Sequence, residues 1–542
     1  MKPLQLTFIA ILFSLFSLSG CSSFMRSANT ESQEPAVVQL PETVGELTRP
    51  HGLGAFAIES VGLVTGLAST GSDPPPSQQR QSLLEEMKKR KVANPNQVLA
   101  ADTTSIALVR AVLPPGLQKG DAIDVEVRVP GRSKTTSLDG GWLMETSLRE
   151  VAVLDQSIRS GHVRGVAEGP VLVDGWIQDE GDDVSMVRGR ILGGAVATKS
   201  RPFGLNLRSD HHSISISKLI GAAINQRFDT YVRGRRQGAA TPKTDKFIEL
   251  QIHPRYRNNL VRYRRVIEQI KLRETPDDRI ERIGVLEGEL LVPATSSLAA
   301  LKLEAIGDEA ADTLKKGLES PSPEVRFYAA EALAYLDQAE AGSILGESAL
   351  EPAFRSRALL ALGAMSSVEA HDALVSLLHV ASAETRYGAF QALQQMNPRD
   401  PLLGQTMLGR VYLHEIASDA EPMVHVARTR RPEIVLFGID QPIQTPMMVL
   451  VGKKLIVRNE GPNRVRVTRY SADGEDKIRV CNTTVNELVR ALVEVEAAYP
   501  EIVRVLQEAK KQGSIPSRLE FDAIPKAGRT FNRSNSDQEE SL

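Results

Sequence analysis

The stretch Ile123-Asp-Val-Glu-Val-Arg-Val129 alternates apolar and charged residues without a break. Such a period of two is typical of a β-strand that buries one face and exposes the other. Just upstream, Ile106-Ala-Leu-Val-Arg-Ala-Val-Leu113 is an almost continuous apolar run that ends at two prolines, which predicts a strand buried on both faces. Residues 51–295 carry mainly strand patterns, interrupted by amphipathic helices predicted at residues 77–90 and 213–228. This part is therefore predicted to be α+β.

Residues 296–410 differ from the rest because they repeat. Three segments superpose without gaps: Val325-Arg-Phe-Tyr-Ala-Ala-Glu-Ala-Leu333, Phe354-Arg-Ser-Arg-Ala-Leu-Leu-Ala-Leu362 and Thr385-Arg-Tyr-Gly-Ala-Phe-Gln-Ala-Leu393. Their spacing of about 30 residues resembles short HEAT-like repeats, in which helix pairs stack because none can bury its apolar stripe alone. We predict a short α-solenoid here. The arginines in register, Arg326, Arg355 and Arg386, are expected to bind helix-end carbonyls or carboxylates of the next repeat.

Strand patterns return over residues 420–525, and two helices close this part. Thr484-Val-Asn-Glu487 has the pattern of a capping box, in which hydroxyl and carboxylate bind backbone donors reciprocally, and it predicts the start of the first helix. The polar residues 526–542 are predicted to be a disordered tail.

The first residues indicate an envelope lipoprotein. Residues 1–21 combine a positive start with an apolar run that is too short for a bilayer span, which needs roughly 20 residues, but that fits a signal peptide. The run ends in Leu18-Ser-Gly-Cys21, which resembles a lipobox, so Cys21 is the predicted lipid attachment site. Ser22 after it favours the outer membrane, and residues 22–50 read as a flexible tether. Cys481 then has no partner and is expected to be a small buried hydrophobe.

The charge composition argues against one class of function, nucleic-acid binding. With 65 basic and 67 acidic residues, the formal net charge is −2, so no global field recruits nucleic acid. The basic cluster Arg255, Arg257, Arg262, Arg264 and Arg265 is interpreted as a solvated helix face, with contact to anionic wall polymers or a neighbouring subunit as the alternative.

Catalytic and metal motifs are incomplete. His414-Glu415 begins like a zinc-protease helix, but Ser418 stands where the second histidine would be needed. The pair His211-His212 is expected to be a loop feature rather than a metal site, and Gly140-Gly141 a tight turn rather than an anion cradle. We therefore predict no enzyme activity, no cofactor and no metal.

Several stretches resemble the flagellar P-ring protein family. Its opening motif matches Val61-Gly-Leu-Val-Thr-Gly-Leu-Ala-Ser-Thr-Gly-Ser-Asp73. Further matches follow in the family's order over residues 107–115, 120–129 and 137–148, and residues 484–518 resemble its two closing helices. The resemblance as a whole covers about two thirds of the chain, over residues 51–295 and 420–525. The lipobox and the repeats depart from the family, so the chain looks like a lipoprotein variant whose P-ring-like core is interrupted by a solenoid.

The resemblance implies a structural subunit of the P ring around the flagellar rod. It implies a homo-oligomeric ring in the periplasm, with the rod and outer ring proteins as partners, contact with peptidoglycan, and a role in motility. Cys21 adds attachment to a membrane. The alternative is a lipid-anchored envelope scaffold whose HEAT-like repeats bind a protein partner. A third reading, an envelope enzyme, lacks an acid/base pair.

Overall fold

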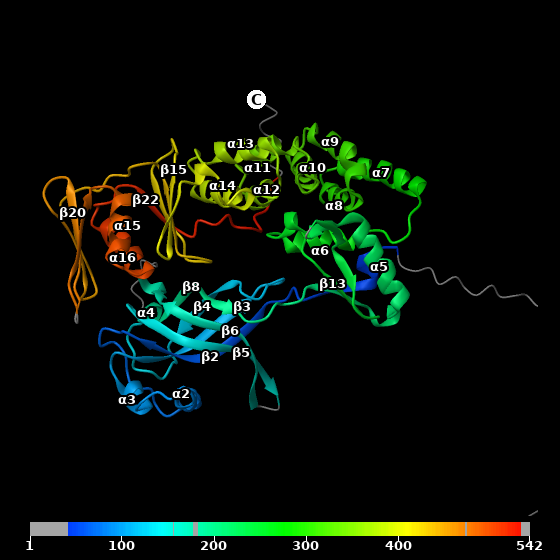
Figure 1. Cartoon of the computed structure of the whole chain (residues 1–542). Coiled ribbons are helices and arrows are strands. Elements are labelled where there is room, and N and C mark those ends of the chain that lie inside the picture. The colour runs from blue at the N-terminus through cyan, green and yellow to red at the C-terminus, as the bar shows by residue number, and fades with distance from the viewer. Residues whose placement is uncertain (1–41, 155–156, 177–182, 233, 472–473, 533–542) are drawn as a thin grey trace, which may run out of the picture. The chain divides into compact units, whose positions relative to one another are not determined.

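The computed structural model describes residues 42–154, 157–176, 183–232, 234–471 and 474–532 (Figure 1). The predicted signal peptide, Cys21 and most of the predicted tether lie outside these residues. The end of that tether is structured, because helix α1 (Val44–Leu47) and strand β1 (Thr48–His51) occupy it. Helix α1 has only four residues, which is too short to produce a period, and the sequence therefore predicts a longer tether.

Residues 56–197 form a closed antiparallel barrel. Its strands are β2 (Phe56–Thr65), β3 (Ser105–Leu113), β4 (Ala122–Arg128), β5 (Trp142–Leu154), β6 (Ser157–Pro170) and β8 (Arg188–Ala197). They pair in the order β4-β3-β2-β5-β6-β8, and β8 pairs back to β4, while β7 (Leu172–Val173) extends from β8. Ile123, Val125 and Val127 point into the barrel core, which confirms the predicted alternation. The short helix α4 (Asp183–Met186) precedes β8.

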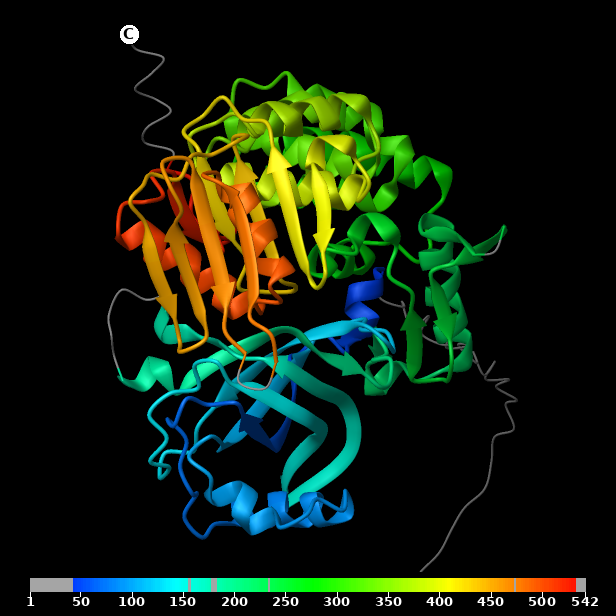
Figure 2. The same ribbon diagram turned by 60° about the vertical axis from the view of Figure 1, so that its left-hand side comes forward.

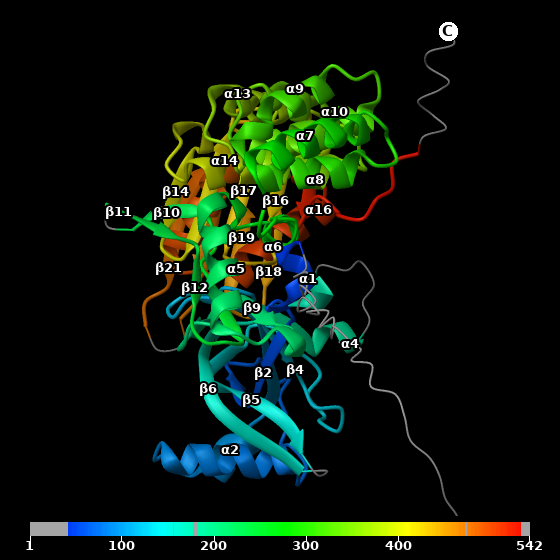
Figure 3. The same ribbon diagram turned by 90° about the vertical axis from the view of Figure 1, so that its right-hand side faces the viewer.

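Helices α2 (Gln78–Lys89) and α3 (Pro95–Ala100) lie against one end of the barrel (Figures 1 and 3). Ile106 packs against them from outside, so the start of β3 is buried on both faces as predicted. Val112, near the other end of the same strand, is 41% exposed. The predicted double burial is wrong there, because the helices cover only part of the outer face.

A second sheet follows the barrel. Its order is β1-β9-β13-β12, with β9 (Gly204–Leu207), β13 (Phe247–Leu250) and β12 (Ala240–Pro242). Helices α5 (Ile214–Arg227) and α6 (Leu260–Glu268) join the same hydrophobic cluster as this sheet, and β10 (Asp229–Val232) with β11 (Arg235–Gly238) forms a separate hairpin (Figure 3).

A run of helices then occupies residues 276–396. Its members are α7 (Pro276–Leu290), α8 (Ser296–Ile306), α9 (Ala311–Leu318), α10 (Pro323–Tyr335), α11 (Ala341–Ser348), α12 (Arg355–Leu362), α13 (Val368–Leu377) and α14 (Ala383–Met396). The three superposed segments lie on α10, α12 and α14. Their register residues are buried alike: Ala329, Ala358 and Ala389, and then Leu333, Leu362 and Leu393.

The register arginines bind carbonyls at the end of the preceding helix, as the sequence predicts. Arg326 donates to Ser320 O and Pro321 O, at 2.8 and 2.7 Å. Arg355 donates to Ala349 O and Leu350 O and also to the carboxylate of Glu384 in the next repeat. Arg386 donates to Ala381 O and Glu421 O. Each guanidinium thus binds the loop that precedes its own helix; Arg355 also reaches α14, and Arg386 also reaches the segment before β16.

The last part contains two sheets and two helices, and the yellow and orange strands are clearest in Figure 2. One sheet has the order β14-β15-β17-β16-β22 and the other the order β18-β19-β20-β21. The bounds are β14 (Gln405–Leu408), β15 (Val411–Ile416), β16 (Met423–Val426), β17 (Glu433–Phe437), β18 (Met448–Val451), β19 (Leu455–Asn459), β20 (Arg464–Arg469), β21 (Lys477–Asn482) and β22 (Arg518–Phe521). Helices α15 (Val485–Glu494) and α16 (Tyr499–Lys511) pack against them. This part begins at Gln405, before the predicted end of the solenoid at residue 410.

Candidate functional site

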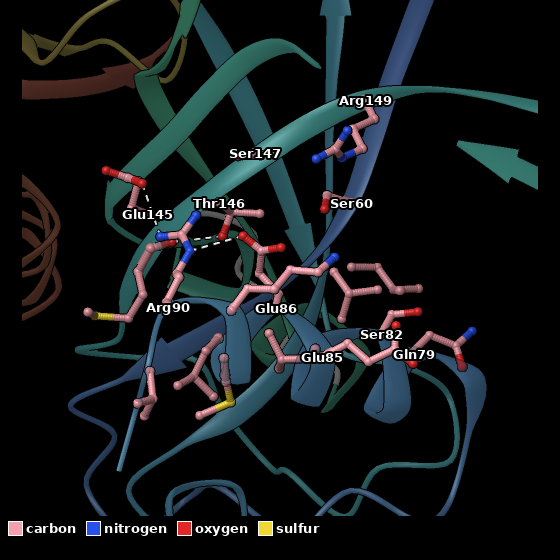
Figure 4. Close-up of a pocket in the computed structure, with 18 of the residues that line it drawn as sticks. Ser60, Gln79, Ser82, Glu85, Glu86, Arg90, Glu145, Thr146, Ser147 and Arg149 are labelled. Atoms are coloured by element: carbon pink, nitrogen blue, oxygen red, sulfur yellow. Dashed lines mark hydrogen bonds and ion pairs between the residues drawn. The ribbon is translucent and has the colours of Figure 1, made fainter. Parts of the chain in front are cut away.

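A groove of about 770 Å³ lies between α2 and the outer faces of β2 and β5 (Figure 4). Its apolar lining includes Val61, Leu63, Leu83, Met87 and Val98. These residues form or contact the small cluster that fixes α2 on the barrel. The groove therefore exists because α2 touches the strands with only one apolar stripe, and its polar side chains stay at the rim.

Arg90 pairs with two of the carboxylates that line the groove. Its guanidinium lies 3.0 Å from the carboxylate of Glu86 and 3.0 Å from that of Glu145, as the dashed lines in Figure 4 show. Glu59, also at the rim, faces Arg110 at 3.5 Å. No histidine or cysteine lines the groove. Because these carboxylates are already paired with guanidinium groups at an open rim, the arrangement suits recognition of another surface rather than catalysis.

The motif at residues 61–73 packs the end of β2 against neighbouring backbone. A Cβ on Gly62 would lie 2.6 Å from Thr146 Oγ1, and one on Gly71 would lie 2.1 Å from Thr104 O. The Gly71 N–H donates to Asp102 O at 2.7 Å, and the Thr70 hydroxyl donates to Ser137 O at 2.9 Å. Close packing therefore explains why glycine stands at positions 62 and 71.

The interpretation of the basic cluster as a solvated helix face is wrong for Arg262, whereas Arg257 and Arg265 are exposed. Arg262 is buried, and its guanidinium contacts Glu304 and Glu331 on α8 and α10. Arg255 pairs with Asp337 at 2.7 Å, and Arg264 pairs with Glu268 at 2.8 Å on the same helix. The partners of Arg262 and Arg255 lie 42 or more residues further along the chain, so a local pattern does not reveal them.

The network around Arg262 is nearly closed to solvent. The Tyr256 hydroxyl donates to Glu304 Oε1 at 2.7 Å, and Arg262 lies over the Tyr335 ring at 4.8 Å. Arg357 of α12 donates to Glu331 Oε1 at 2.9 Å. Burial acts to raise the pKa of Glu331, but the two guanidinium groups outweigh it and lower that pKa. The network therefore joins α6 to three helices of the repeat run.

The other motifs have structural roles. His414 lies on strand β15 and not on a helix; its Nδ1 is 2.9 Å from Leu403 O. His212 Nε2 is 3.2 Å from Leu207 O. Gly141 N donates to Leu138 O at 3.0 Å and Gly140 has φ +71°, which confirms the predicted tight turn. Within the described parts of the chain, no cluster of three or more His, Cys, Asp or Glu side chains could hold a metal ion.

Two imidazoles, one buried at His425 and one partly buried at His253, predict how stability responds to acid. Burial lowers the pKa of His425 to about 3, and burial together with the charge of Arg255 lowers the pKa of His253 to about 4. Unfolding restores a pKa near 6.5, so the unfolded chain binds more protons below that pH. Each contribution to stability is therefore complete above pH 6.5 and is lost as the pH falls toward 4 or 3.

We expect His425 to reduce the free energy of unfolding by about 1 kcal/mol between pH 6 and 5, where most carboxylates remain ionised. The partly exposed His253 should contribute less, because solvent screens its charge. Urea titrations at both pH values measure the loss. The variant His425→Asn should remove its share of the slope, and an unchanged slope would contradict the assignment.

Cys481 is a buried free thiol 3.7 Å from Val465 O, as the sequence predicts. Burial, assisted by the charges of Glu487 and Glu494, raises its pKa to about 11. We expect Ellman's reagent at pH 8 to leave the folded chain unlabelled and to react fully after unfolding in urea. Rapid labelling without denaturant would show that this strand edge opens, and Cys481→Ala gives the background.

Comparison with known proteins concerns the barrel and the sheet that follows it. Residues 44–285 match the family model described as flagellar P-ring protein. Over these residues, the chain matches the flagellar P-ring protein family. The groove and the motif at residues 61–73 lie inside this match, whereas α8 to α14 and the later sheets lie outside it. The predicted resemblance of residues 484–518 therefore stays a prediction.

Curated relatives named flagellar P-ring protein include one from Escherichia fergusonii, which is 29% identical over 251 residues, covering 44% of this chain and 63% of the relative. Another, from Escherichia coli O1:K1, is 29% identical over 265 residues and covers 46% of this chain and 67% of the relative. The chain thus spans just under two thirds of the first relative. Among the described residues, every helix is too short or too polar to span a bilayer.

Proposed function

We propose that this chain is a non-catalytic, ring-forming subunit of the flagellar basal body, lying around the rod in the periplasm. The match of residues 44–285 to the P-ring family carries the proposal. The geometry agrees with it, because the motif glycines serve backbone packing and the groove pairs its carboxylates with arginine. Such a subunit needs a head-to-tail interface that closes a ring, and no chemistry.

The repeats are proposed to belong to the same rigid subunit. Besides the Arg262 network, Asn258 donates to Gln395 at 2.6 Å and Asn259 donates to the Tyr335 hydroxyl at 2.9 Å. These contacts run from the segment before and at the start of α6, inside the P-ring match, to helices outside it. In this proposal the HEAT-like helices are an additional part of the ring subunit and not a separately moving domain.

The first test is to purify intact basal bodies and measure this chain by quantitative mass spectrometry. We expect a copy number close to that of the other ring proteins, and sedimentation of the purified lipoprotein should show closed oligomers. Absence from basal bodies, with abundance elsewhere in the envelope, would refute the ring function.

Lipid attachment at Cys21 is proposed from the lipobox, with the outer membrane as its site because Ser22 follows. Metabolic labelling with palmitate should mark the wild type and not Cys21→Ser. Fractionation should then place the wild type in the outer membrane and the variant in the soluble periplasm. Labelling of the variant, or recovery of the wild type in the inner membrane, would contradict the respective part.

The second candidate function is an envelope scaffold whose HEAT-like repeats bind a protein. It is favoured by the contacts that these helices make with Arg529 and Phe531 of the same chain. Excising residues 297–403 separates the two, since motility should survive if the core is the function. Excision removes Glu304 and Glu331, so the excised chain should carry Arg262→Gln and be checked for folding by circular dichroism. Loss of motility in a folded excised chain would favour the scaffold.

A further inference from the structure

The chain does not stop at its last strand. After β22, the segment drawn in red in Figure 1 leaves the sheet and runs to the helices of the repeat run. The Ala523 N–H donates to Nε2 of the buried His425 at 3.0 Å. Pro525 lies beside Gly388 of α14, where a Cβ would come within 2.6 Å of its ring. The segment thus crosses α14 in close contact.

Two residues of this segment bind the repeats by their side chains. Arg529 donates from two nitrogens to the two carboxylate oxygens of Glu384, each at 2.8 Å. The Phe531 ring stacks on Phe354 with centroids 4.9 Å apart and an interplanar angle of 23°. The sequence predicts a disordered tail from residue 526, but a bidentate ion pair and a ring stack fix the segment at Arg529 and Phe531.

The receiving side chains are held in place by the repeats themselves. Glu384 also accepts from Arg355 at 3.2 Å. Burial acts to raise the pKa of Glu384, yet the bonds and charges of Arg529 and Arg355 outweigh it and lower that pKa. Phe354 stacks on Phe327 at 4.4 Å on its other side, so the ring column continues into the core. A site whose acceptor carboxylate and ring are fixed beforehand loses little entropy when a ligand arrives.

The geometry points to a peptide-binding site on α12 and α14 that accepts a short extended segment with an arginine and, two residues later, an aromatic ring. The chain's own residues 523–531 are its resident ligand. Glu384 recognises the arginine by its planar fork, which lysine does not reproduce, and Phe354 recognises the ring. A partner that uses this face of the repeats must carry the same chemistry and displace the segment.

The first experiment measures tryptic cleavage after Lys526 in the full chain, followed by mass spectrometry. We expect Arg529→Glu, Glu384→Arg and Phe531→Ala each to speed this cleavage by about tenfold, because cleavage follows the population of the released segment. The double variant Arg529→Glu with Glu384→Arg should return to within about threefold of wild type. The exposed charge reversal Lys511→Glu serves as the matched control and should not change the rate.

Single variants within twofold of wild type would overturn the proposal. Fast cleavage in the double variant would overturn the Arg529–Glu384 recognition, because Glu384 would then act only through Arg355.

The second experiment measures binding in trans by fluorescence anisotropy. The probe is a labelled peptide with the sequence of residues 523–532. It should bind the full-length variant Arg529→Glu at least tenfold more tightly than wild type, whose own segment competes, and should not bind Glu384→Arg. A peptide carrying Arg529→Ala and Phe531→Ala is the control ligand. Equal binding to all three chains, or no binding to Arg529→Glu, would refute a peptide site.

Discussion

Arg262→Met is expected to lower the free energy of unfolding by about 3–5 kcal/mol, because removing one partner of a buried ion pair leaves the other charge uncompensated. The Glu304 side chain is fully buried, and its guanidinium contacts come from Arg262 while Tyr256 supplies one more hydrogen bond. Methionine fills much of the vacated volume but donates nothing to the carboxylate. Urea unfolding followed by circular dichroism, with the midpoint as the readout, measures the loss.

Arg264→Met provides the matched control on the same helix. Arg264 pairs with Glu268 at i,i+4, where both side chains are partly exposed, and such pairs contribute about 0.3–0.5 kcal/mol. The double variant Arg262→Met with Glu304→Leu should recover most of the loss, since it also removes the carboxylate that Arg262→Met leaves without a guanidinium. Equal losses for Arg262→Met and Arg264→Met would show that the buried network does not carry this stability.

Local periodicity predicts much of this fold. The alternation at Ile123–Val129 and the helix at residues 77–90 are confirmed, since each depends on residues close together in the chain. The predicted carbonyl contacts of Arg326 and Arg355 are confirmed for the same reason, because those carbonyls lie six residues earlier. The α+β class follows from the same patterns. The capping box at Thr484 is wrong in its detail: Thr484 is the N-cap of α15, but its side chain makes no capping hydrogen bond.

Contacts between residues that are far apart in the chain could not be predicted from the sequence. Closure of the barrel depends on the pairing of β4 with β8, which lies 60 or more residues later in the chain. The sequence pattern of a strand does not indicate which other strand it pairs with. Likewise the arginine-rich run at α6 reads as a solvated face until Glu304 and Glu331 are placed beside it. The tail shows the same limit, because Arg529 and Phe531 stand in a polar segment whose partners lie 145 or more residues earlier.

The second large effect is expected at Gly71, the last glycine of the motif at residues 61–73. In Gly71→Ala, the new Cβ would lie 2.1 Å from Thr104 O and 2.7 Å from Asp102 O. Both are backbone atoms just before β3, so no side chain can rotate away to make room. Overpacking costs about 1–3 kcal/mol, and breaking the partly exposed Gly71 N–H to Asp102 O bond costs about 0.5–1.5 kcal/mol more.

We therefore expect Gly71→Ala to lower the free energy of unfolding by about 2–4 kcal/mol and to reduce the yield of soluble chain. Gly131→Ala is the control: it lies in the turn after β4, a Cβ there meets no atom within 4 Å, and its effect should stay within about 0.5 kcal/mol. Thermal unfolding of both variants measures this difference in stability. If Gly71→Ala melts like Gly131→Ala, close packing does not explain this glycine. Its place in the motif would then be better explained by contact with a neighbouring ring subunit, which ring assembly of the same variant would reveal.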